Sequence, residues 1–236
     1  MKLLALETSA KAASCAVLED GAPLASAWQC TGLTHSGTLL PMVEDLLKNS
    51  GLALGDMDAL AAAAGPGSFT GLRIGIAAVK GLAWAAELPC VPVSTLEAMA
   101  WPLAHLEGTV ACAMDARRQQ VYHAVFRASG GALERLRADC AVSLEEAASG
   151  LADLPGPVTV VGDGAALLHG FLQERGIPSR MAPGHLRWQS AVGVGLAAMA
   201  LWPEGAVHAQ ALKPNYLRLS QAERERLAKL EAGSEA

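Results

Sequence analysis

The most restrictive feature of this 236-residue sequence is an order of predicted strands and helices that occurs twice. In residues 1–106, three short strands precede alternating helices and strands, in the order β-β-β-α-β-α-β-α. The same order returns in residues 107–219, at an offset of roughly 100 residues. A repeated supersecondary unit of this kind predicts an α/β protein with two similar halves, each with a mainly β-meander sheet flanked by helices.

Hydrophobic periodicity defines the elements of the first half. Apolar residues at helical spacing predict a helix over residues 36–50, and a second helix is predicted over residues 70–87. Residues 59–64 are mostly alanine, which alone favours helix, but the run ends at Gly65-Pro66-Gly67 and is interpreted as a buried strand. Ser94 and Glu97 form a capping box that predicts the start of a third helix. The predicted strands of this half span residues 3–6, 13–18, 24–28, 59–64 and 90–93.

The second half carries similar signals. Ser129-Gly130-Gly131 predicts a hairpin turn, and Ser143 with Glu146 forms another capping box. Gly176 is typical of a helix end, and Pro203 stops the last predicted helix. The predicted strands of this half span residues 110–114, 121–127, 132–141, 158–161 and 177–181, and the predicted helices span residues 143–151, 165–175 and 190–202.

This order of elements is typical of ribonuclease H-like and actin-like proteins. Two such halves side by side make an actin-like ATPase fold with a cleft between them. We therefore expect an N-terminal half over residues 1–106, a C-terminal half over 107–219 and a charged tail over 220–236. Seven of the 16 residues from 221 to 236 are charged, which favours a solvated tail helix, the alternative being a tail that binds a partner.

Composition excludes several classes of protein. The chain is 52% hydrophobic and 17% charged, whereas disordered chains are poor in apolar residues and rich in charge. Aromatic residues make up only 4%, so alanine, leucine and valine must build the core. The net charge is −5 and no long basic run occurs, which argues against a surface that follows a nucleic-acid backbone by itself.

Cysteines and apolar runs predict the compartment. The five cysteines are widely spaced and include no CxxC pair, which favours reduced, buried thiols over a disulfide framework or a zinc site. The apolar run near the N-terminus has four residues, too few for the core of a signal peptide. The longest late run, residues 191–202, is too short to cross a bilayer. We expect a soluble, cytoplasmic protein without a membrane partner.

An acidic residue ends the first strand of each half. Glu7, followed by Thr8 and Ser9, ends the first, and Asp115 ends the second. In a doubled fold the two strand ends face each other across the cleft, where an acid can hold a metal-bound phosphate and hydroxyl groups can hold phosphate oxygens. The alternative is that both acids only satisfy local turns. Residues 162–164, Gly162, Asp163 and Gly164, are able to approach an adenosine, but they equally suit a strand-to-helix turn.

The glycine-rich segment of residues 65–75 is the most informative motif. A loop of this kind points backbone N–H groups at any anion bound there. It contains no GK[ST] and misses GxGxxG by one residue, so a Rossmann cofactor site is a weak alternative. Close packing of a strand and a helix, or a tight contact with another chain, explains the same glycines. The candidate residues of a partner interface and of this glycine loop are His35, Gly65, Gly67, Ser68, Thr70, Gly71, Arg73 and Gly75.

Other catalytic patterns are missing from the sequence. His35 is a single histidine before the first helix, and no two of the six histidines lie four residues apart, so HxxxH and HExxH metal motifs do not occur. No Gx[ST]xG nucleophile elbow occurs either. Residues 59–64, the fourth strand, carry no carboxylate, which argues against a two-metal nuclease. We expect no tightly bound catalytic metal and no catalytic residue.

Several motifs together resemble the TsaB family, also called YeaZ, and the resemblance covers residues 1 to about 218 in order. The run Gly-Pro-Gly-Ser-Phe-Thr-Gly-Leu-Arg-Ile-Gly is its most specific part. The segments that carry the resemblance are Leu6-Glu7-Thr8-Ser9, Thr34-His35-Ser36 with Leu39 and Pro41, residues 65–75, Met114-Asp115-Ala116-Arg117-Arg118 with Val121-Tyr122, Gly162-Asp163-Gly164 and Pro214-Asn215-Tyr216-Leu217-Arg218.

The resemblance implies a role in making threonylcarbamoyladenosine at adenosine 37 of tRNA. It implies a non-catalytic scaffold that activates the catalytic paralogue TsaD, whose HxxxH motif this sequence lacks. It further implies the ATPase TsaE as a partner, a homodimer in isolation, and tRNA contact only through the complex. It implies no cofactor of the chain's own, with ATP or ADP and Mg²⁺ at the cleft or a complex interface as an open alternative. The alternative function is a stand-alone actin-like ATPase or small-molecule kinase that uses the cleft.

The first two predicted helices are unusually apolar for surface helices. A helix that buries one stripe needs only about a third of its circumference apolar. Residues 36–50 and 70–87 exceed this, and Gly71, Gly75 and Ala78 would permit a close helix–helix contact. We therefore expect these helices to bury an apolar face against another subunit, whether a second copy or the paralogue. The alternative is that both are central core helices.

Overall fold

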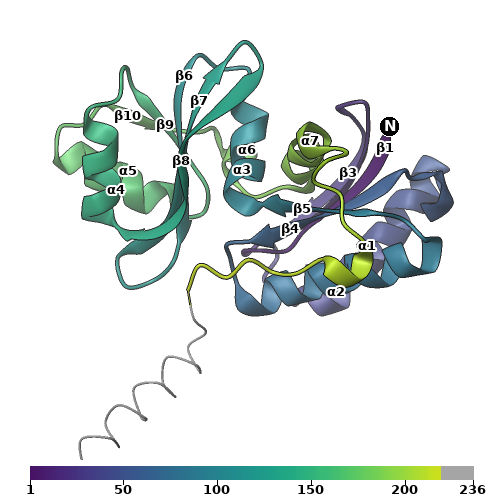
Figure 1. Cartoon of the computed structure of the whole chain (residues 1–236). Helices are drawn as coiled ribbons and strands as arrows, with labels where there is room; N and C mark the ends of the chain where they lie inside the picture. Colours follow the sequence, from purple (N-terminus) through teal and green to yellow (C-terminus); the bar gives the residue numbers. More distant parts are fainter. Residues whose placement is uncertain (219–236) are drawn as a thin grey trace, which may run out of the picture.

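The computed structural model describes residues 1–218 and contains two five-stranded sheets (Figure 1). The first has the strand order β3-β2-β1-β4-β5, and the second has the equivalent order β8-β7-β6-β9-β10. In both sheets the three meander strands pair antiparallel and the remaining two extend the sheet in parallel. The predicted duplicated, actin-like α/β architecture is therefore confirmed. The predicted tail, 220–236, lies outside the described residues.

The first sheet comprises β1 (Lys2–Glu7), β2 (Ala13–Glu19), β3 (Ala22–Gln29), β4 (Ala59–Gly65) and β5 (Cys90–Ser94). One face is covered by α1 (His35–Ser50), α2 (Phe69–Ala86) and the 3₁₀ turns η1 (Leu54–Asp56) and η3 (Ala209–Ala211). Strand β4 is almost all alanine, yet it is a strand because it is buried on both faces between β1 and β5. Its small side chains allow helices to pack closely on each side.

The second sheet comprises β6 (Gly108–Asp115), β7 (Gln120–Ser129), β8 (Ala132–Ser143), β9 (Val158–Val161) and β10 (Ser179–Met181). Helices α4 (Leu144–Ala152) and α5 (Ala165–Glu174) cover one face with alanine and leucine side chains. Ser143 and Glu146 make the predicted capping box of α4 in full. The structure adds α6 (Gly184–Arg187), a short helix for which the sequence carries no periodic signal.

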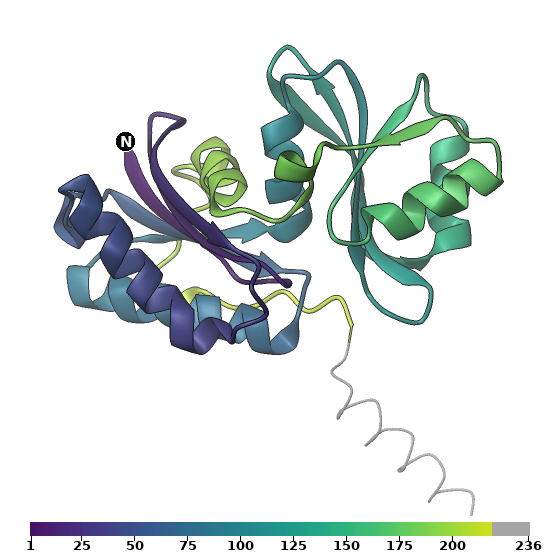
Figure 2. The ribbon, with the colours of Figure 1, turned by 180° about the vertical axis from the view of Figure 1, so that it is seen from behind.

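The remaining helices cross between the halves, as Figures 1 and 2 show. Helix α7 (Ala191–Leu201) follows the second sheet in sequence, but its buried side chains pack on the first sheet. Helix α3 (Thr95–Ala100) and the turn η2 (Trp101–Leu103) follow the first sheet but pack on β6 and β7 of the second. Residue 106 thus separates the strands of the two halves. The helices do not follow this division, because α3 precedes residue 106 but packs on the second sheet, and α7 follows it but packs on the first.

All five cysteines lie in the described residues as free thiols. Cys15, Cys90 and Cys112 are buried in strands, as expected for core thiols. Two differ from the expectation of buried thiols, because Cys30 is exposed beyond the end of β3 and Cys140 is only half-buried. Among the described residues, no helix is long and apolar enough to cross a membrane.

Candidate functional site

A groove of about 620 Å³ lies where the ends of β1 and β6 meet, as the repeated topology predicts. It combines hydroxyl groups of the glycine-rich loop with charged side chains from the second half and from the end of the described chain. We call it the interdomain groove. Its polar lining residues are Ser9, Lys11, Ser68, Thr70, Asp115, Arg117, Tyr122, Asp163 and Arg218.

Glu7 does not open into this groove. Its side chain is fully buried, and one carboxylate oxygen accepts a hydrogen bond from the backbone N–H of Ser9. The other oxygen has no hydrogen-bond partner among the described residues. Burial raises the pKa of Glu7 to about 7, with a further increase from the nearby carboxylate of Asp163. Glu7 and Asp115 were predicted to face each other across the cleft. Glu7 is instead buried inside the first half and does not line the groove.

The glycine-rich loop seals it. Thr8 donates a hydrogen bond from its hydroxyl to the carbonyl oxygen of Gly71 at 2.8 Å, and a Cβ at Gly71 would overlap with the carbonyl oxygen of Thr8. A Cβ at Gly75 would overlap with the Thr8 hydroxyl in the same way. The backbone N–H of Ser68 donates to the carbonyl oxygen of Ser9 at 2.7 Å, beside Gly67. These glycines serve close strand–helix packing, one of the readings that the sequence left open.

The other side of the same loop is covered by residues 213–218. The backbone N–H of Asn215 donates to the carbonyl oxygen of Ala64, next to Gly65. Tyr216 stacks on Phe69 with ring centroids 4.1 Å apart, and Arg73 Nε donates to the Tyr216 hydroxyl at 2.9 Å. Arg73 is thus held by Tyr216, close to the end of the described residues. The sequence motif 214–218 signalled this segment, but no pattern pointed to its partners.

Asp115 lies at the groove with an exposed side chain. Its carboxylate accepts a hydrogen bond from the backbone N–H of Arg117 at 2.7 Å. The following turn, Arg117, Arg118 and Gln119, has three consecutive residues with φ between 55° and 63°, a left-handed conformation that is uncommon outside glycine. Arg218 Nη1 donates to the carbonyl oxygen of Ala116 at 2.9 Å, so it joins this turn to residues 213–218.

Asp163 completes the groove from the second half. Its carboxylate accepts a hydrogen bond from Gln189 Nε2 at 2.9 Å, and burial raises its pKa. A Cβ at Gly162 would overlap with the carbonyl oxygen of Ala113, and the backbone N–H of Gly164 donates to that same oxygen at 3.0 Å. The segment 162–164 therefore packs on the end of β6, where it holds Asp163 near Asp115.

His35 is not a lining residue of the groove. Its Nε2 donates to the carbonyl oxygen of Ala10 at 2.8 Å, and the ring is half-buried at the start of α1. This contact joins α1 to the β1–β2 connection. No group of three or more His, Cys, Asp or Glu side chains in the described part of the chain is placed to hold a metal ion.

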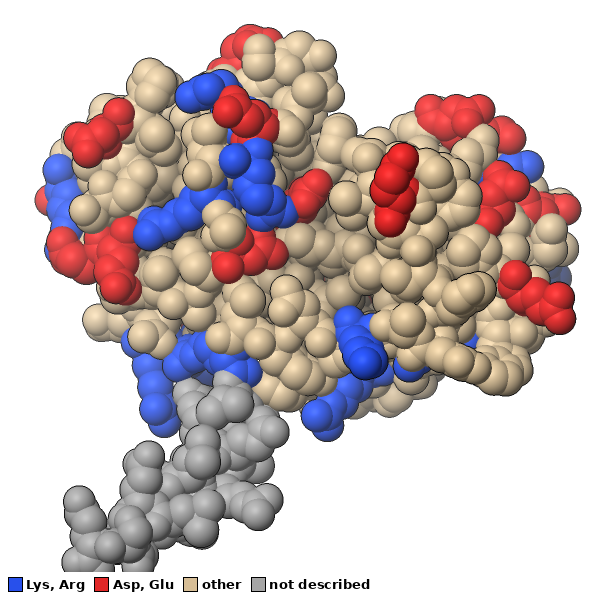
Figure 3. Space-filling view, viewed as in Figure 1, with Lys and Arg blue, Asp and Glu red and all other residues tan. Residues whose placement is uncertain are grey.

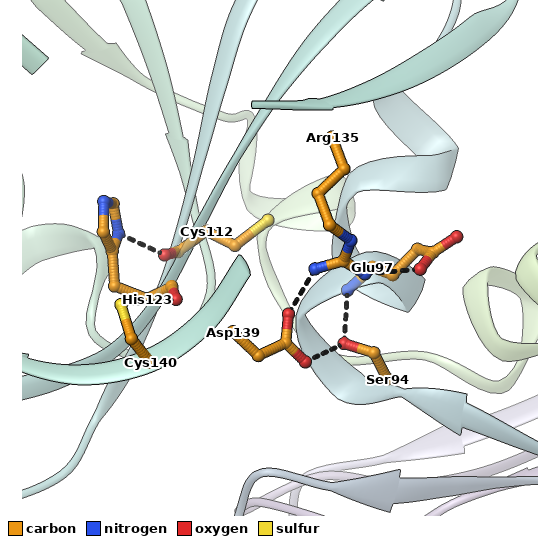
Figure 4. Close-up of polar contacts among 7 residues, drawn as sticks. All are labelled: Ser94, Glu97, Cys112, His123, Arg135, Asp139 and Cys140. Carbon is orange, nitrogen blue, oxygen red and sulfur yellow. Dashed lines mark hydrogen bonds and ion pairs between the residues drawn. The ribbon is translucent and has the colours of Figure 1, made fainter. Parts of the chain in front are cut away.

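A polar cluster joins the two halves away from the groove (Figure 4). Arg135 of β8 pairs with Asp139 and, at 2.5 Å, with Glu97 of α3, while the Ser94 hydroxyl donates to Asp139 at 2.5 Å. The Arg135 guanidinium also lies 4.6 Å from the ring centre of Phe126. Glu97 therefore serves the contact between the halves, so the predicted capping box at Ser94 is reduced to the Ser94 side chain, which accepts from the N–H of Glu97.

A buried histidine also lies in the close-up of Figure 4. His123 Nδ1 donates to the carbonyl oxygen of Cys112 at 2.8 Å, and burial lowers the pKa of His123 to about 4. The imidazole is therefore neutral near pH 7. Its position inside the second sheet makes it a core residue.

The most exposed residues in the central part of α2 carry no charge, although the half-buried Lys80 lies among them. Between Ile74 and Ala85, the exposed residues are Ala77, Gly81, Trp84 and Ala85. Trp84 is 67% exposed, and Leu40 of the neighbouring α1 is 48% exposed. Both helices bury their other faces in the core, which includes Leu39, Val43, Ile76 and Val79. Exposed apolar area on two adjacent helices is typical of an interaction surface.

Charged groups are unevenly placed on the face drawn in Figure 3. Lys and Arg side chains gather along its lower edge, beneath the junction of the halves, whereas Asp and Glu dominate the outer part of the first half. The basic residues of the interdomain groove, Lys11, Arg117 and Arg218, face two carboxylates, Asp115 and Asp163. The groove therefore has the donors to bind an anion.

Comparison with known proteins agrees with this architecture. The family model of TsaD, tRNA N6-adenosine threonylcarbamoyltransferase, matches residues 30–225. The Bacillus subtilis tRNA threonylcarbamoyladenosine biosynthesis protein TsaB is 33% identical over 227 residues, which cover 94% of this chain and 96% of that protein. The Escherichia coli TsaB protein is 45% identical, but the match covers 54% of this chain and 55% of that protein.

Solved structures give the same result. YeaZ from Pseudomonas aeruginosa has a TM-score of 0.76 at 32% identity and covers 92% of this chain and 99% of its own. Component A of the Acidaminococcus fermentans (R)-2-hydroxyglutaryl-CoA dehydratase has a TM-score of 0.50 at 17% identity, which shows a shared fold alone.

Two equivalent five-stranded sheets with exchanged helices and a groove at the strand ends define a member of the actin-like class. Within that class, the chain belongs to the TsaB (YeaZ) family, inside the wider family that the TsaD model describes.

Proposed function

We propose that this chain acts in the biosynthesis of threonylcarbamoyladenosine in tRNA as a non-catalytic subunit that binds and activates a TsaD-type catalytic paralogue. The relatives that cover most of the chain carry the TsaB and YeaZ names. The observation that carries the proposal is the exposed apolar surface of α2, which includes Ala77 and Trp84, on a helix that contacts α1 with its exposed Leu40. A surface of this kind is suited to a partner with a matching apolar helix pair.

The buried carboxylate supports a non-catalytic role. Glu7 is sealed beneath the glycine-rich loop, so it is not placed to hold a metal-bound phosphate in the groove. The sequence also lacks the pair of histidines four residues apart that the resemblance assigns to the catalytic paralogue. In this proposal the chain supplies a docking surface and the paralogue supplies the transferase chemistry.

The same surface would be used by a second copy of the chain, and the remaining proposed partners would join afterwards. A second copy of the chain would use it in isolation, and TsaD would compete with that homodimer, because both need the same residues of α1 and α2. A standard interface buries roughly 1,600 Å² in total, with a few apolar anchors dominating. The ATPase TsaE and the tRNA substrate would join the resulting complex, and the tRNA would be held mainly by the other subunits.

A charge placed on the α2 surface tests the proposal. Ala77→Glu puts a carboxylate at an exposed position in the middle of α2, and Ala166→Glu puts one at an exposed alanine of α5 as a matched control. We expect Ala77→Glu to weaken TsaD binding at least tenfold in sedimentation experiments and to reduce threonylcarbamoyladenosine formation by the reconstituted complex. Equal binding by both variants, with the fold intact, would contradict the proposed surface.

A second candidate function is a stand-alone ATPase or small-molecule kinase. The interdomain groove favours it, because Lys11, Arg117 and Arg218 are placed to bind phosphate groups and Asp115 and Asp163 to bind a phosphate-bound Mg²⁺. We would measure turnover of ATP with Mg²⁺ by the purified chain, alone and with TsaD. Turnover by the chain alone that is lost in Asp115→Asn would favour the enzyme; turnover only in the complex would favour the subunit.

A further inference from the structure

The edge of the first sheet presents an unprotected strand. Within residues 1–218, strand β3 pairs only with β2, so no described strand pairs with the backbone groups along its outer side. None of its eight residues is charged. Its equivalent at the edge of the second sheet, β8, carries Glu134, Arg135, Arg137 and Asp139. Charged residues are a common means by which proteins prevent unwanted pairing at a sheet edge, and β3 lacks them.

Only the first part of β3 is protected. Pro23 has no backbone N–H, and the pairing with β2 shifts register next to it, between Val17 and Leu18. The regular part, residues 25–29, is free of both features. In Figure 2 this strand crosses the near side of the first half, between α1 and α7.

Hollows lie on both sides of this free edge. One, of about 740 Å³, lies between β3 and α1, and we call it the α1-side groove. The other, of about 500 Å³, lies between β3 and the segment that holds α6 and the start of α7, and we call it the α6-side pocket. Ser26 and Ala27 line both of them, so they form the ridge between the two.

The two hollows differ in chemistry. Asp45 is the single charged residue that lines the α1-side groove in the described part of the chain, and polar groups such as those of Gln29, Thr38 and Asn49 surround it. The α6-side pocket is lined by aromatic and aliphatic side chains, Trp28, Leu186 and Trp188, together with His185. Trp28 is fixed there because its indole N–H donates to the carbonyl oxygen of Gln189 at 3.1 Å. One side is thus suited to a basic side chain and the other to an apolar or aromatic one.

We infer that β3 binds an extended peptide segment as an additional strand of the first sheet, with a basic side chain in the α1-side groove and an apolar or aromatic side chain in the α6-side pocket. The unpaired backbone groups of an edge strand select an extended chain, because only such a chain can complete the ladder. Successive side chains of a strand point to opposite faces, so the sequence numbers of the basic and the apolar residue must differ by an odd number, as at positions i and i+1 or i and i+3. The free edge of five residues matches a peptide segment of similar length.

This site does not depend on the proposed TsaD surface. The α1 residues that line the α1-side groove are Gly37, Thr38, Pro41, Met42, Asp45, Leu46, Asn49 and Ser50. Leu40, which belongs to the proposed partner surface, is not among them. Loss of one interaction therefore leaves the other intact.

The probe is the blocked, fluorescently labelled peptide Lys-Val-Lys-Phe-Lys-Val-Lys-Thr, and binding to the full chain is followed by fluorescence anisotropy. Two further versions of the peptide are methylated on the backbone nitrogen of alternate residues. One version has the methyl groups at the odd-numbered residues, and the other has them at the even-numbered residues. In a bound strand only one of these sets of N–H groups faces β3, so we expect one version to bind at least tenfold more weakly and the other to bind like the parent. A further version has glutamate in place of lysine and should not bind.

Matched variants locate the site on the protein. Asp45→Asn should weaken binding of the parent peptide about threefold, as loss of a partly exposed charge pair predicts, whereas Glu44→Gln on the same helix should not change it. Trp28→Ala should weaken binding about tenfold, whereas Trp84→Ala, at an exposed tryptophan of α2, should not. Circular dichroism and thermal unfolding of each variant confirm that the fold is retained.

Several results would overturn the inference. These are no binding of the peptide up to millimolar concentration, equal binding of both N-methylated versions, or equal binding of the glutamate version. A homodimer that is dissociated by Ser26→Lys but not by Ala77→Glu would show that a second copy of the chain occupies the β3 edge. That result would also overturn the inference of a peptide site. If the peptide binds with the expected pattern, the result supports a peptide site at β3, whether or not Ala77→Glu weakens TsaD binding.

Discussion

Helices α2 and α5 occupy equivalent places, because each connects the second and third parallel strands of its half. Helix α2 has 18 residues, and its exposed central surface is made of alanine, glycine and tryptophan. Helix α5 has 10 residues, and its exposed positions run from Ala166, Leu167 and Gly170 to Gln173 and Glu174. The shared topology sets where each helix lies, whereas the outward residues set how far an apolar exposed surface extends along it.

The strand ends differ in the same manner. Glu7 ends β1 and is fully buried, while Asp115 ends β6 and is exposed. The surroundings of the two acids differ. Residues 65–71 pack onto Thr8 and Ser9 and cover the end of β1, whereas the exposed carboxylate of Asp115 accepts a hydrogen bond from the backbone N–H of Arg117 in the turn that follows it. Duplicated units thus keep an acid at the same position but not the same chemistry.

The largest expected effect concerns the glycines of the two helices. Gly71→Val places a side chain against the carbonyl oxygen of Thr8, and backbone atoms cannot move aside. We expect the free energy of unfolding to fall by roughly 4 kcal/mol. Gly170→Ala in α5 has open space around the new Cβ and should raise that free energy by about 0.5–1 kcal/mol. Urea unfolding measures both, and similar effects at the two sites would remove this difference between the halves.

The second effect concerns Glu7 and pH. Burial raises the pKa of its carboxyl from 4.5 to about 7, so between these values the folded protein keeps a proton that the unfolded chain releases. The stability contribution therefore falls as the pH rises through this window, by about 3 kcal/mol in total. Glu7→Gln should remove this loss, so the variant should gain stability relative to the wild type between pH 4.5 and 7. A constant difference between the two proteins across that window would refute the burial of a neutral Glu7.

The third effect compares two arginines of the second half. Arg135 joins the halves through Glu97 and Asp139 and lies against Phe126, with 32% of its side chain exposed. Arg127 pairs with Glu134, with about half of each side chain exposed. We expect Arg135→Ala to cost about 2 kcal/mol, because it leaves two partly buried carboxylates without their cation. Arg127→Ala should cost less than about 0.5 kcal/mol. Thermal and urea unfolding measure both losses. If Arg135→Ala lowered the free energy of unfolding no more than Arg127→Ala does, the contact of Arg135 between the halves would add no more stability than a surface ion pair.

The repeated topology was predictable from sequence because it depends on local patterns. Alternation, helical periodicity, the Asp20-Gly21 and Gly130-Gly131 turns and the Ser143 cap each act over a few residues. The expected meeting of the two strand ends, which brings Ser9 and Asp115 to one groove, followed from topology alone. The predicted helix boundaries are off by one residue at each end of α1 and α2 at most.

Other features depend on contacts between distant segments and have no local signal. The exchange of α3 and α7 between the halves is decided by which sheet face remains uncovered. The burial of Glu7 follows from how closely the glycine-rich loop approaches β1, and a glycine in a sequence does not reveal what it lies against. The stack of Phe69 on Tyr216 joins residues far apart in the sequence. Such pairs become visible only when the chain is folded.

The smallest expected effect concerns the two sheet edges. Ser26 is exposed in the middle of β3, so Ser26→Lys should change the free energy of unfolding by less than about 0.5 kcal/mol, because no core contact is lost. It gives β3 the kind of charge that β8 already carries, so the two edges become alike. We expect aggregation on heating, measured by light scattering, to begin a few degrees later in the variant, since an edge strand with lysine pairs less readily with other chains. Gln29→Lys at the end of the same strand serves as a second test at a different position. If neither lysine delays aggregation while stability is unchanged, the β3 edge is already protected in the folded protein, and the contrast with β8 lies in sequence but not in behaviour.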